Sequence, residues 1–144
     1  MAFRGTFEYS LDAKKRLNVP PKFRPALSGG LVLAKDFQPC VAIWARDAFD
    51  HHQDLYTQGF HPMSADRQKI VRFFSHGSFD AELDSAGRVT LNQVLLDYAG
   101  IEKDVVVAGT LDHVQVWNPE SWRADQAELP AAVMSIGESF GHPG

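Results

Sequence analysis

Cysteine is nearly absent from this chain of 144 residues, in which Cys40 is the only one. A disulfide within the chain and a cysteine-based zinc cluster are therefore excluded, and we expect Cys40 to be a small, partly buried apolar residue. Long apolar runs are also missing: none approaches the roughly 18 residues of a membrane-spanning helix, and the N-terminus lacks the apolar segment of a signal peptide. The sequence thus predicts a cytoplasmic protein with no membrane partner.

Motifs of common enzymes are missing as well. The sequence contains no G-x-S-x-G nucleophile elbow, no phosphate-binding G-x-x-x-x-G-K-[ST] loop and no G-x-G-x-x-G dinucleotide fingerprint. His51 and His52 are adjacent, so on a helix they diverge by about 100° and do not form the i, i+4 pair that chelates a metal. We expect both, and His61, to lie on a solvated helix face. The sequence predicts no enzymatic activity, no metal site and no cofactor.

Positive charge is scarce overall but concentrated near the N-terminus. The chain has a net charge of −4, yet residues 1–24 contain six basic and two acidic side chains, a local net of +4, so the remaining 120 residues carry −8. A net negative charge disfavours nonspecific binding of nucleic acid. A segregated basic patch is nevertheless sufficient for binding when only one face of the protein meets phosphate. The sequence pI of about 5.8 is therefore compatible with DNA binding.

An internal repeat is the most specific feature of the sequence. Residues 5–17 align without a gap with residues 77–89 at an offset of 72, and glycine, phenylalanine, leucine, aspartate and arginine coincide. Aromatic residues further along also correspond, at an offset of 73: Trp44 with Trp117, and Phe49 with Trp122. The alignment indicates two copies of one structural unit, and the length of the chain favours a single compact fold that both copies share.

Each repeat begins with a strand that leads into an Asp-x-x-x-Arg turn. Apolar and polar residues alternate before and after the turn in both repeats, which is typical of half-buried strands. The motifs, Asp12 to Arg16 and Asp84 to Arg88, are therefore expected at the tip of a strand–turn–strand unit. Gly87 supports a turn because glycine accepts positive φ. Apolar runs predict two further buried strands in each repeat, over residues 31–34 and 41–44 and over residues 105–108 and 114–117.

Short helices are predicted over residues 21–27, 47–56 and 94–99, and from Asn118 onward. A connecting helix capped by Ser64 carries four apolar residues, which either pack in the core or form a subunit interface: Ile70, Val71, Phe73 and Phe74. The chain thus divides into a first repeat at 1–58, a connecting helix at 59–76, a second repeat at 77–128 and a flexible C-terminal tail at 129–144.

The first turn presents Lys14-Lys15-Arg16, and we expect the donors of these side chains to be free for a ligand. The planar fork of arginine suits guanine and lysine suits phosphate, so a tip that presents both can position and read a duplex. In a structural interpretation, Arg16 and Arg88 instead pair with Asp12 and Asp84 across their turns. The two interpretations are compatible, because an arginine anchored by aspartate is preorganised for binding.

The two aspartates also suggest a catalytic dyad shared between the repeats, as in aspartic proteases. Such a site needs small hydroxyl- and glycine-containing neighbours. Asp12 is followed by Ala13-Lys14-Lys15, and Asp84 by Ser85-Ala86-Gly87. The flanking residues therefore disfavour this alternative.

Five groups of residues, in this order, resemble the MraZ family of bacterial transcriptional regulators. They are Phe3-Arg4-Gly5, Leu11-Asp12-Ala13-Lys14 with Arg16-Leu17, Pro21-Lys22-Phe23-Arg24, Val71-Arg72-Phe73-Phe74-Ser75, and Leu83-Asp84 with Gly87-Arg88. The similarity spans about residues 3–123. It implies an α+β fold, a swapped-hairpin AbrB-like double-split β-barrel. The two halves of one chain would form the pseudo-symmetric unit that other AbrB-type proteins build by dimerising, with short helices at the periphery.

The resemblance also implies a function and a partner. MraZ proteins form ring-shaped homo-oligomers and repress the division and cell-wall gene cluster by binding short direct repeats of double-stranded DNA upstream of it. By position, the implied DNA-binding residues are Arg4, Lys14, Lys15, Arg16 and Arg88, and the residues that maintain the motif are Asp12, Asp84 and Gly87. The protein would then be associated with the nucleoid. An AbrB-like antitoxin or an oligomeric protein-interaction scaffold remains the alternative.

One departure from the family pattern concerns the first turn. Lys15 stands where family members usually carry glycine, so this turn is expected to differ in geometry and to gain a positive charge. The second turn offers only Arg88, and we therefore expect the first turn to be the stronger DNA contact.

Overall fold

The computed structural model describes residues 2–141 and combines helices with antiparallel strands, in agreement with the predicted α+β class. The strands are β1 (Thr6–Ser10), β2 (Arg16–Asn18), β3 (Leu31–Lys35), β4 (Val41–Ala45), β5 (Ser78–Ala81), β6 (Arg88–Thr90), β7 (Asp104–Gly109) and β8 (Val114–Trp117). The helices are the 3-10 turn η1 (Pro21–Phe23), α1 (Arg24–Leu27), α2 (Arg46–Thr57), α3 (Ala65–His76), α4 (Gln93–Ala99) and α5 (Pro119–Gly141).

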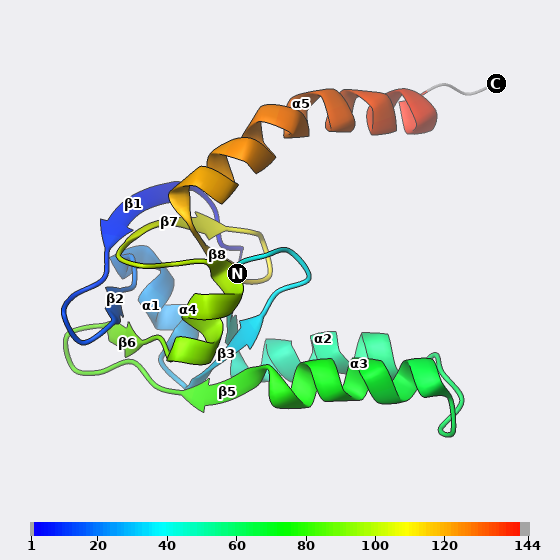
Figure 1. Ribbon diagram of the computed structural model, residues 1–144, viewed down its shortest axis with the longest axis horizontal. Coiled ribbons are helices and arrows are strands. Elements are labelled where there is room, and N and C mark those ends of the chain that lie inside the picture. Colours follow the sequence, from blue (N-terminus) through cyan, green and yellow to red (C-terminus); the bar gives the residue numbers. More distant parts are fainter. Residues whose placement is uncertain (1, 142–144) are drawn as a thin grey trace.

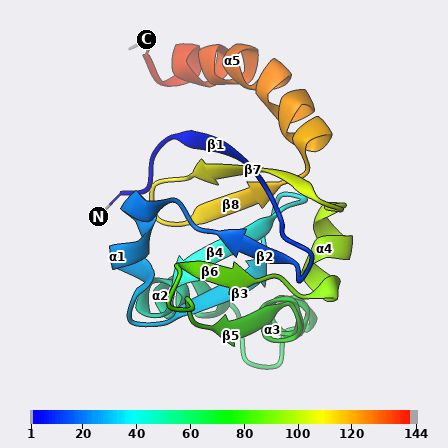
Figure 2. The same cartoon turned by 90° about the vertical axis from the view of Figure 1, so that its left-hand side faces the viewer.

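Six strands form one antiparallel sheet in the order β1-β7-β8-β4-β3-β5, and this order, which can be followed in Figure 2, exchanges strands between the repeats (Figures 1 and 2). The first strand of each repeat pairs with the third strand of the other, so that Phe7 lies opposite Val107 and Phe79 lies opposite Leu33. The last strands, β4 and β8, pair at the centre. Equivalent strands thus occupy equivalent positions from either edge, which gives the sheet an internal two-fold pseudo-symmetry.

The second strands of the two repeats form a separate ribbon in which β2 pairs antiparallel with β6 (Figure 2). Each turn joins two strands, as predicted, but these strands pair with different partners and not with each other. The physical reason lies in burial. Leu17 and Val89 face each other in the ribbon, and pairing across the repeats buries both in the shared core, where they are 0% and 2% exposed.

One apolar core joins the six-stranded sheet, the ribbon and the helices α1 and α4. Its largest fully buried members come from both repeats: Leu17, Leu27, Leu31, Leu33, Ile43, Leu91, Leu95 and Leu96. The described residues contain no buried polar or charged side chain. The hydrogen-bonded strands of residues 2–141 make two sheets and not one closed barrel.

Helices α2 and α3 cover the outer face of β3 and β4. Phe49 of α2 and Phe74 of α3 pack with Trp44 in a second apolar cluster, and Ile70 and Phe73 lie at its margin. The apolar residues of the connecting helix were expected either to pack in the core or to form a subunit interface. For Ile70, Phe73 and Phe74, packing within the chain is the interpretation that the structure supports. Ser64 caps α3 as predicted, because its hydroxyl accepts a hydrogen bond from the N–H of Arg67 at 3.3 Å.

His52 is not on a solvated face, contrary to prediction. His51 is exposed on α2 as predicted, whereas His61 is exposed in the loop between α2 and α3 and not on a helix. The rings of His52 and His113 both stack on Trp44, each with a centroid distance of 4.3 Å. His52 lies on the side of α2 that packs against the sheet, which explains why it is half-buried. The sequence led to the same prediction for all three histidines, because it does not show which side of the helix faces the strands.

Helix α5 begins as predicted, with Asn118 Oδ1 accepting hydrogen bonds from the N–H groups of Glu120 and Ser121 at 2.8 and 3.2 Å. Residues 129–141, predicted as part of a flexible tail at 129–144, continue this helix; residues 142–144 lie outside the described part of the chain. Leu129, Ala131, Ala132 and Met134 are strong helix formers and favour the helix despite Pro130. None of the described helices has the length and apolar character needed to cross a bilayer.

Candidate nucleic-acid interface

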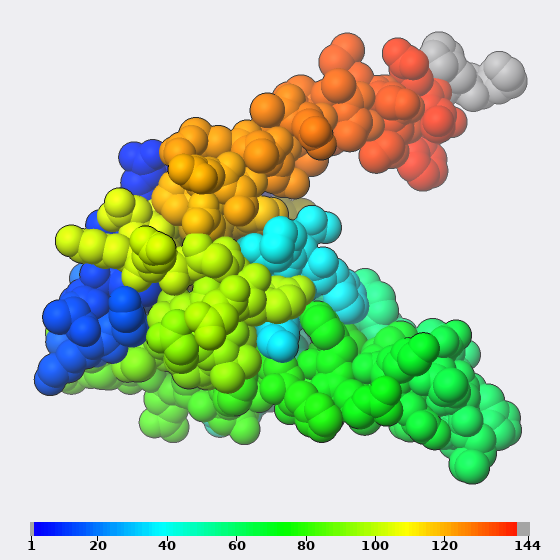
Figure 3. Space-filling model, in the orientation of Figure 1, coloured from blue at the N-terminus to red at the C-terminus, as the bar shows by residue number. Residues whose placement is uncertain are grey.

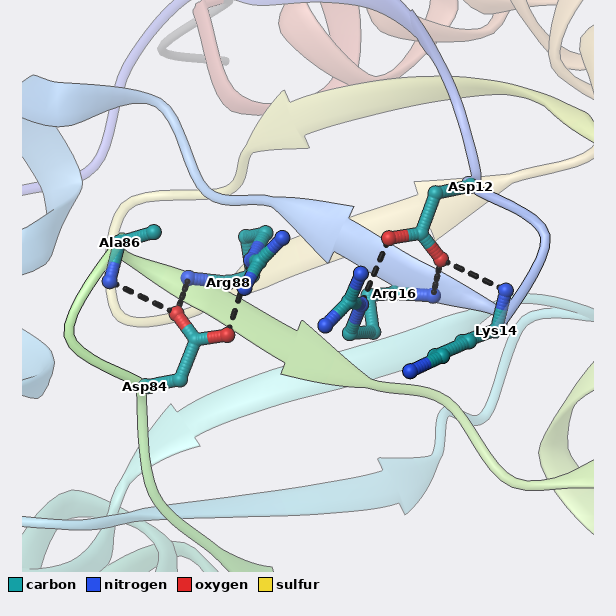
Figure 4. A network of polar contacts seen from close by, with 6 residues as sticks. All are labelled: Asp12, Lys14, Arg16, Asp84, Ala86 and Arg88. Atoms are coloured by element: carbon teal, nitrogen blue, oxygen red, sulfur yellow. Dashed lines mark hydrogen bonds and ion pairs between the residues drawn. The ribbon is translucent and has the colours of Figure 1, made fainter.

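The two Asp-x-x-x-Arg turns contain the same hydrogen bonds (Figure 4). Oδ1 of Asp12 accepts bonds from the backbone N–H groups two and four residues further along, each at 2.9 Å, and Oδ1 of Asp84 accepts the equivalent two bonds, also at 2.9 Å. Aspartate thus forms each turn by binding its own backbone, a common use of this residue. Asp12 and Asp84 lie at opposite ends of the ribbon in Figure 4, so they do not form a shared dyad.

Each aspartate also holds the arginine of its own turn. Nε of Arg16 donates to Oδ2 of Asp12 at 2.6 Å, and Nε of Arg88 donates to Oδ2 of Asp84 at 2.8 Å. Among the described residues, only the Nε atom of each arginine side chain donates to a protein acceptor, so the two terminal amino groups of each guanidinium are free for a ligand. The predicted pairing across each turn is therefore confirmed, and it leaves the outer edge of each arginine available.

The charge of both aspartates is maintained by the turn itself. The pKa of the Asp12 carboxyl lies below its usual value, chiefly because the backbone N–H of Arg16 donates to it, with the Arg16 side chain adding to the effect. The pKa of Asp84 is lowered in the same way by Arg88. Both carboxylates therefore remain ionised at neutral pH, and a charged acceptor fixes each guanidinium more firmly than a neutral one would.

The first turn has the same geometry as the second, although Lys15 was predicted to change it. Lys15 adopts a φ of 61° where Gly87 has a φ of 77°. The hydrogen bonds to the aspartate thus impose a left-handed backbone on a residue with a Cβ atom, a conformation that costs about 1–2 kcal/mol. The prediction of free donors is also wrong for this residue, because Nζ of Lys15 donates to the carbonyl oxygen of Glu102 at 3.1 Å.

The β2–β6 ribbon turns one face to the core and the other to solvent. Arg16 lies opposite Thr90 and Asn18 lies opposite Arg88, so the two arginines stand diagonally across the outer face (Figure 4). Asn18 and Thr90 are exposed, and both were missed as candidate site residues. The alternation after each arginine was the available signal, since residues two apart in a strand share a face.

Arg24 lies against the second turn and was also missed. A Cβ atom at Gly87 would clash with the guanidinium of Arg24, so this side chain fills the space that the glycine leaves. Nε of Arg24 donates to the carbonyl oxygen of Val19 at 2.8 Å, which holds the guanidinium in place. The second turn therefore has two arginines beside it, and the expectation that it offers only Arg88 is wrong.

Two other residues predicted to contact DNA, Lys14 and Arg4, lie far apart from each other along β1 and the first turn. Lys14 is exposed at the first turn, as predicted. Arg4 is exposed too, but it precedes β1 while Asp12 follows it, so Arg4 lies at the opposite end of that strand from the first turn. The structure thus brings together a ribbon with a turn at each end, and it does not bring Arg4 into that group.

The ribbon offers hydrogen-bond donors and no reaction centre. A guanidinium held on one edge by a carboxylate presents its other edge to an acceptor such as a phosphate oxygen or O6 and N7 of guanine. Within residues 2–141, no group of three or more histidine, cysteine, aspartate or glutamate side chains is placed to hold a metal ion. The chemistry available here is recognition of a negatively charged or acceptor-rich ligand.

The comparisons with known proteins agree with the repeat architecture. A family model described as "MraZ protein, putative antitoxin-like" matches residues 2–69 and 74–137. Proteins named "Transcriptional regulator MraZ" are similar to the chain. The one from Natranaerobius thermophilus is 33% identical over 139 residues, 96% of each chain. That from Micrococcus luteus is 36% identical over 138 residues, 94% of each, and that from Clostridium beijerinckii is 37% identical over 121 residues, 83% of this chain and 84% of the relative. Because the family model covers both repeats, the chain belongs to the MraZ family.

Proposed function

We propose that this protein is a sequence-specific DNA-binding transcriptional regulator, a repressor that acts at direct repeats upstream of the division and cell-wall gene cluster. Relatives named as transcriptional regulators support the regulatory part. One observation carries the DNA-binding part: the aspartates of the two turns hold Arg16 and Arg88 on one outward face of the β2–β6 ribbon. Such a protein acts in the cytoplasm, at the nucleoid, and needs neither catalysis nor a cofactor.

The ribbon has the shape that the major groove of B-DNA admits. In this proposal Arg16 and Arg88 read bases, since bidentate pairing of arginine with O6 and N7 of guanine is the commonest specific contact. Asn18 and Thr90 stand beside them and can bond to further base edges. Lys14 and Lys15 contact phosphates and set the position of the ribbon; Arg4 meets DNA only at the margin of the footprint.

The fold supports this use of the ribbon. In the proposed swapped-hairpin, double-split β-barrel, the six-stranded sheet and the ribbon form one pseudo-symmetric AbrB-like unit, with repeats at 1–58 and 77–128. The exchanged pairing of β1 with β7, of β5 with β3 and of β2 with β6 supports that arrangement. Both copies of the motif then contribute to a single DNA-contacting face.

Assembly compensates for the weakness of a single subunit. A chain with a net charge of −4 and one small basic face binds a duplex weakly. A ring-shaped homo-oligomer that engages several direct repeats gains affinity through the high effective concentration of its remaining subunits. The number and spacing of the repeats then become part of the specificity.

An AbrB-like antitoxin is the second candidate, because the description of the matching family includes the term antitoxin-like. In that case the main partner is a protein, as it would also be for an oligomeric scaffold. A toxin gene beside this one and a stable complex with its product would favour the antitoxin. Tandem repeats upstream of this protein's own gene would favour the repressor.

A footprint of the wild-type protein on the DNA upstream of its own gene tests the proposal. We expect protection of evenly spaced short repeats, and we expect Arg16→Ala to remove that protection while leaving the circular dichroism spectrum unchanged. Arg123→Ala, which removes an exposed arginine outside the ribbon, is the matched control and should protect the same sites. Wild-type protection by a folded Arg16→Ala protein would show that the ribbon is not the contact.

A further inference from the structure

An apolar stripe runs along one side of α5. This is the side that packs against the sheet at the start of the helix. Trp122 packs against Val106 and Trp117 of β7 and β8. The next apolar residues follow at spacings of 7, 4, 3 and 4 and therefore lie on the same side of the helix as Trp122: Leu129, Val133, Ile136 and Phe140. We name these four residues the α5 stripe. Their exposure ranges from 43% for Leu129 to 88% for Phe140, so the chain itself leaves them largely uncovered.

The internal symmetry of the chain indicates that α5 lacks a covering helix. Helix α2 follows β4 as α5 follows β8, and Phe49 of α2 corresponds to Trp122 of α5. Helix α3 covers α2, with the rings of Phe74 and Phe49 6.0 Å apart. In residues 2–141 no helix lies beside α5 after it leaves the sheet (Figures 1 and 2). An amphipathic helix without tertiary packing is only marginally stable in water, so a covering surface from outside the chain would stabilise α5.

A second uncovered apolar surface lies where the β3–β4 loop meets α2 and α3, the two helices that we call the α2–α3 arm. Phe37, Leu55 and Tyr56, which we name the hairpin patch, are 52%, 65% and 41% exposed. They border a pocket of about 320 Å³ whose wall also includes Trp44 and Phe73. Figure 3 shows open space between α5 and the α2–α3 arm, so the stripe and the patch of one chain do not meet.

Charge differs between the two sides of the hairpin patch, because α2, which carries Leu55 and Tyr56, has a net charge of −2 and α3 is basic. Helix α5 carries a net charge of −3, from Glu120, Asp125, Glu128 and Glu138 against Arg123. Helix α3 carries a net charge of +2, from Arg67, Lys69 and Arg72 against Asp66. The acidic α5 is therefore attracted to the α3 side of the patch, whereas two copies of α5 repel each other.

We propose that the α5 stripe of one copy docks on the hairpin patch of a second copy, beside its α3. The proposal rests on the homo-oligomer of the proposed function and names the surfaces that build it. Because the stripe and the patch lie on separate arms, the contact is head-to-tail. After one contact, the first copy retains an unused patch and the second an unused stripe, so the contact repeats until the assembly closes into a ring.

The molecular mass in solution, measured without DNA by light scattering after size exclusion, tests this contact. The variant Val133→Asp with Ile136→Asp places two charges on the stripe, and the control Ala127→Asp with Ala131→Asp places two on the opposite side of the same helix. We expect the wild type and the control to have a multiple of the 16.0 kDa chain mass and the stripe variant to have the mass of one chain. A monomeric wild type, or a stripe variant that keeps the multimer mass, overturns the proposal.

Disulfide trapping tests the same contact by position. The native Cys40 is fully buried, and burial raises the pKa of its thiol, so it does not compete with introduced cysteines. We expect Leu55→Cys and Ile136→Cys proteins, mixed and oxidised, to form a mixed disulfide, whereas Lys103→Cys with Ile136→Cys should not. Equal yields from the two pairs overturn the proposal. The footprint is a separate measurement, and a stripe variant that still binds a single repeat through Arg16 separates failure of assembly from failure of DNA binding.

Discussion

Lys15 and Gly87 occupy equivalent positions in the two turns, and both have a left-handed backbone, with φ of 61° and 77°. We predict that Lys15→Gly raises the free energy of unfolding by up to about 1 kcal/mol, because relief of the left-handed strain exceeds the extra entropy of glycine in the unfolded chain. Urea unfolding measures this change. Lys14 has no positive φ, so the control Lys14→Gly should lower the free energy of unfolding by about 0.5–1 kcal/mol. A loss of stability in both variants would contradict the strain at Lys15.

Gly87 should be sensitive to the smallest added side chain. Gly87→Ala requires an alanine at a φ of 77° and displaces the guanidinium of Arg24, so we predict a loss of at least about 1 kcal/mol in the free energy of unfolding. Gly59 has no positive φ and open space around it, so Gly59→Ala is the control and should change stability by less than about 0.5 kcal/mol. If the two alanine variants unfold at the same urea concentration, Arg24 does not pack on Gly87.

The turns could be predicted from the sequence because their contacts are local. Asp12 and Arg16 are four residues apart, and the bonds between them depend on little outside the motif. The partners of the flanking strands could not be predicted in this way. Alternation identifies which face of a strand is buried but not which strand lies beside it. The pairing of Ser10 with Asp104 depends on a core that forms only when both repeats are present.

Other misses have the same physical origin. Arg24 is far from Gly87 in the sequence, and only the folded chain brings it onto the glycine. His52 is half-buried because its ring stacks on Trp44 of the strand that its helix covers. The helical C-terminal segment was missed for a different reason: its proline, glycine and serine residues suggested a loop, whereas its alanine and apolar residues determine its structure.

Arg24 gives a prediction about the second turn. If its guanidinium meets phosphate beside Arg88, Arg24→Gln should lower DNA affinity and reduce the slope of log K against log salt by about 0.9, the value for one phosphate contact. Titration of a labelled duplex at several salt concentrations measures the slope. Arg123→Gln, which removes the same charge from α5, should leave the slope unchanged. An unchanged slope in Arg24→Gln would restrict Arg24 to a structural role.

The network around His113 predicts a pH dependence of stability. Burial opposes the charged imidazole, but hydrogen bonds to Asp36 at 2.9 Å and to Asp112 at 2.7 Å outweigh it and raise the pKa of His113. The folded protein therefore retains this proton to higher pH than the unfolded chain, in which histidine titrates near pH 6.5. The stabilisation is complete below about pH 6.5 and is lost as pH rises through the raised pKa.

Urea unfolding of the wild type and of His113→Gln between about pH 6 and pH 8.5 measures this effect. We expect the free energy of unfolding to fall with rising pH more steeply in the wild type than in the variant. Burial lowers the pKa of His52, which gives a slope of the opposite sign. The charge of His113 also contributes to lowering the pKa of His52, so the difference between the two curves reports His113 together with its effect on His52. Parallel curves would show that His113 does not gain its proton from this network.

The most direct test of the ribbon is the affinity of single arginine variants for one duplex that contains the upstream repeats, measured by fluorescence anisotropy at fixed salt. Arg16 and Arg88 have equivalent anchors and stand on one face. We predict that Arg16→Gln and Arg88→Gln each raise Kd by about 10- to 100-fold, the effect of losing one bidentate base contact. Arg123→Gln should bind within about twofold of the wild type. Wild-type affinity in both folded ribbon variants would contradict the assignment of the β2–β6 ribbon as the DNA-reading surface.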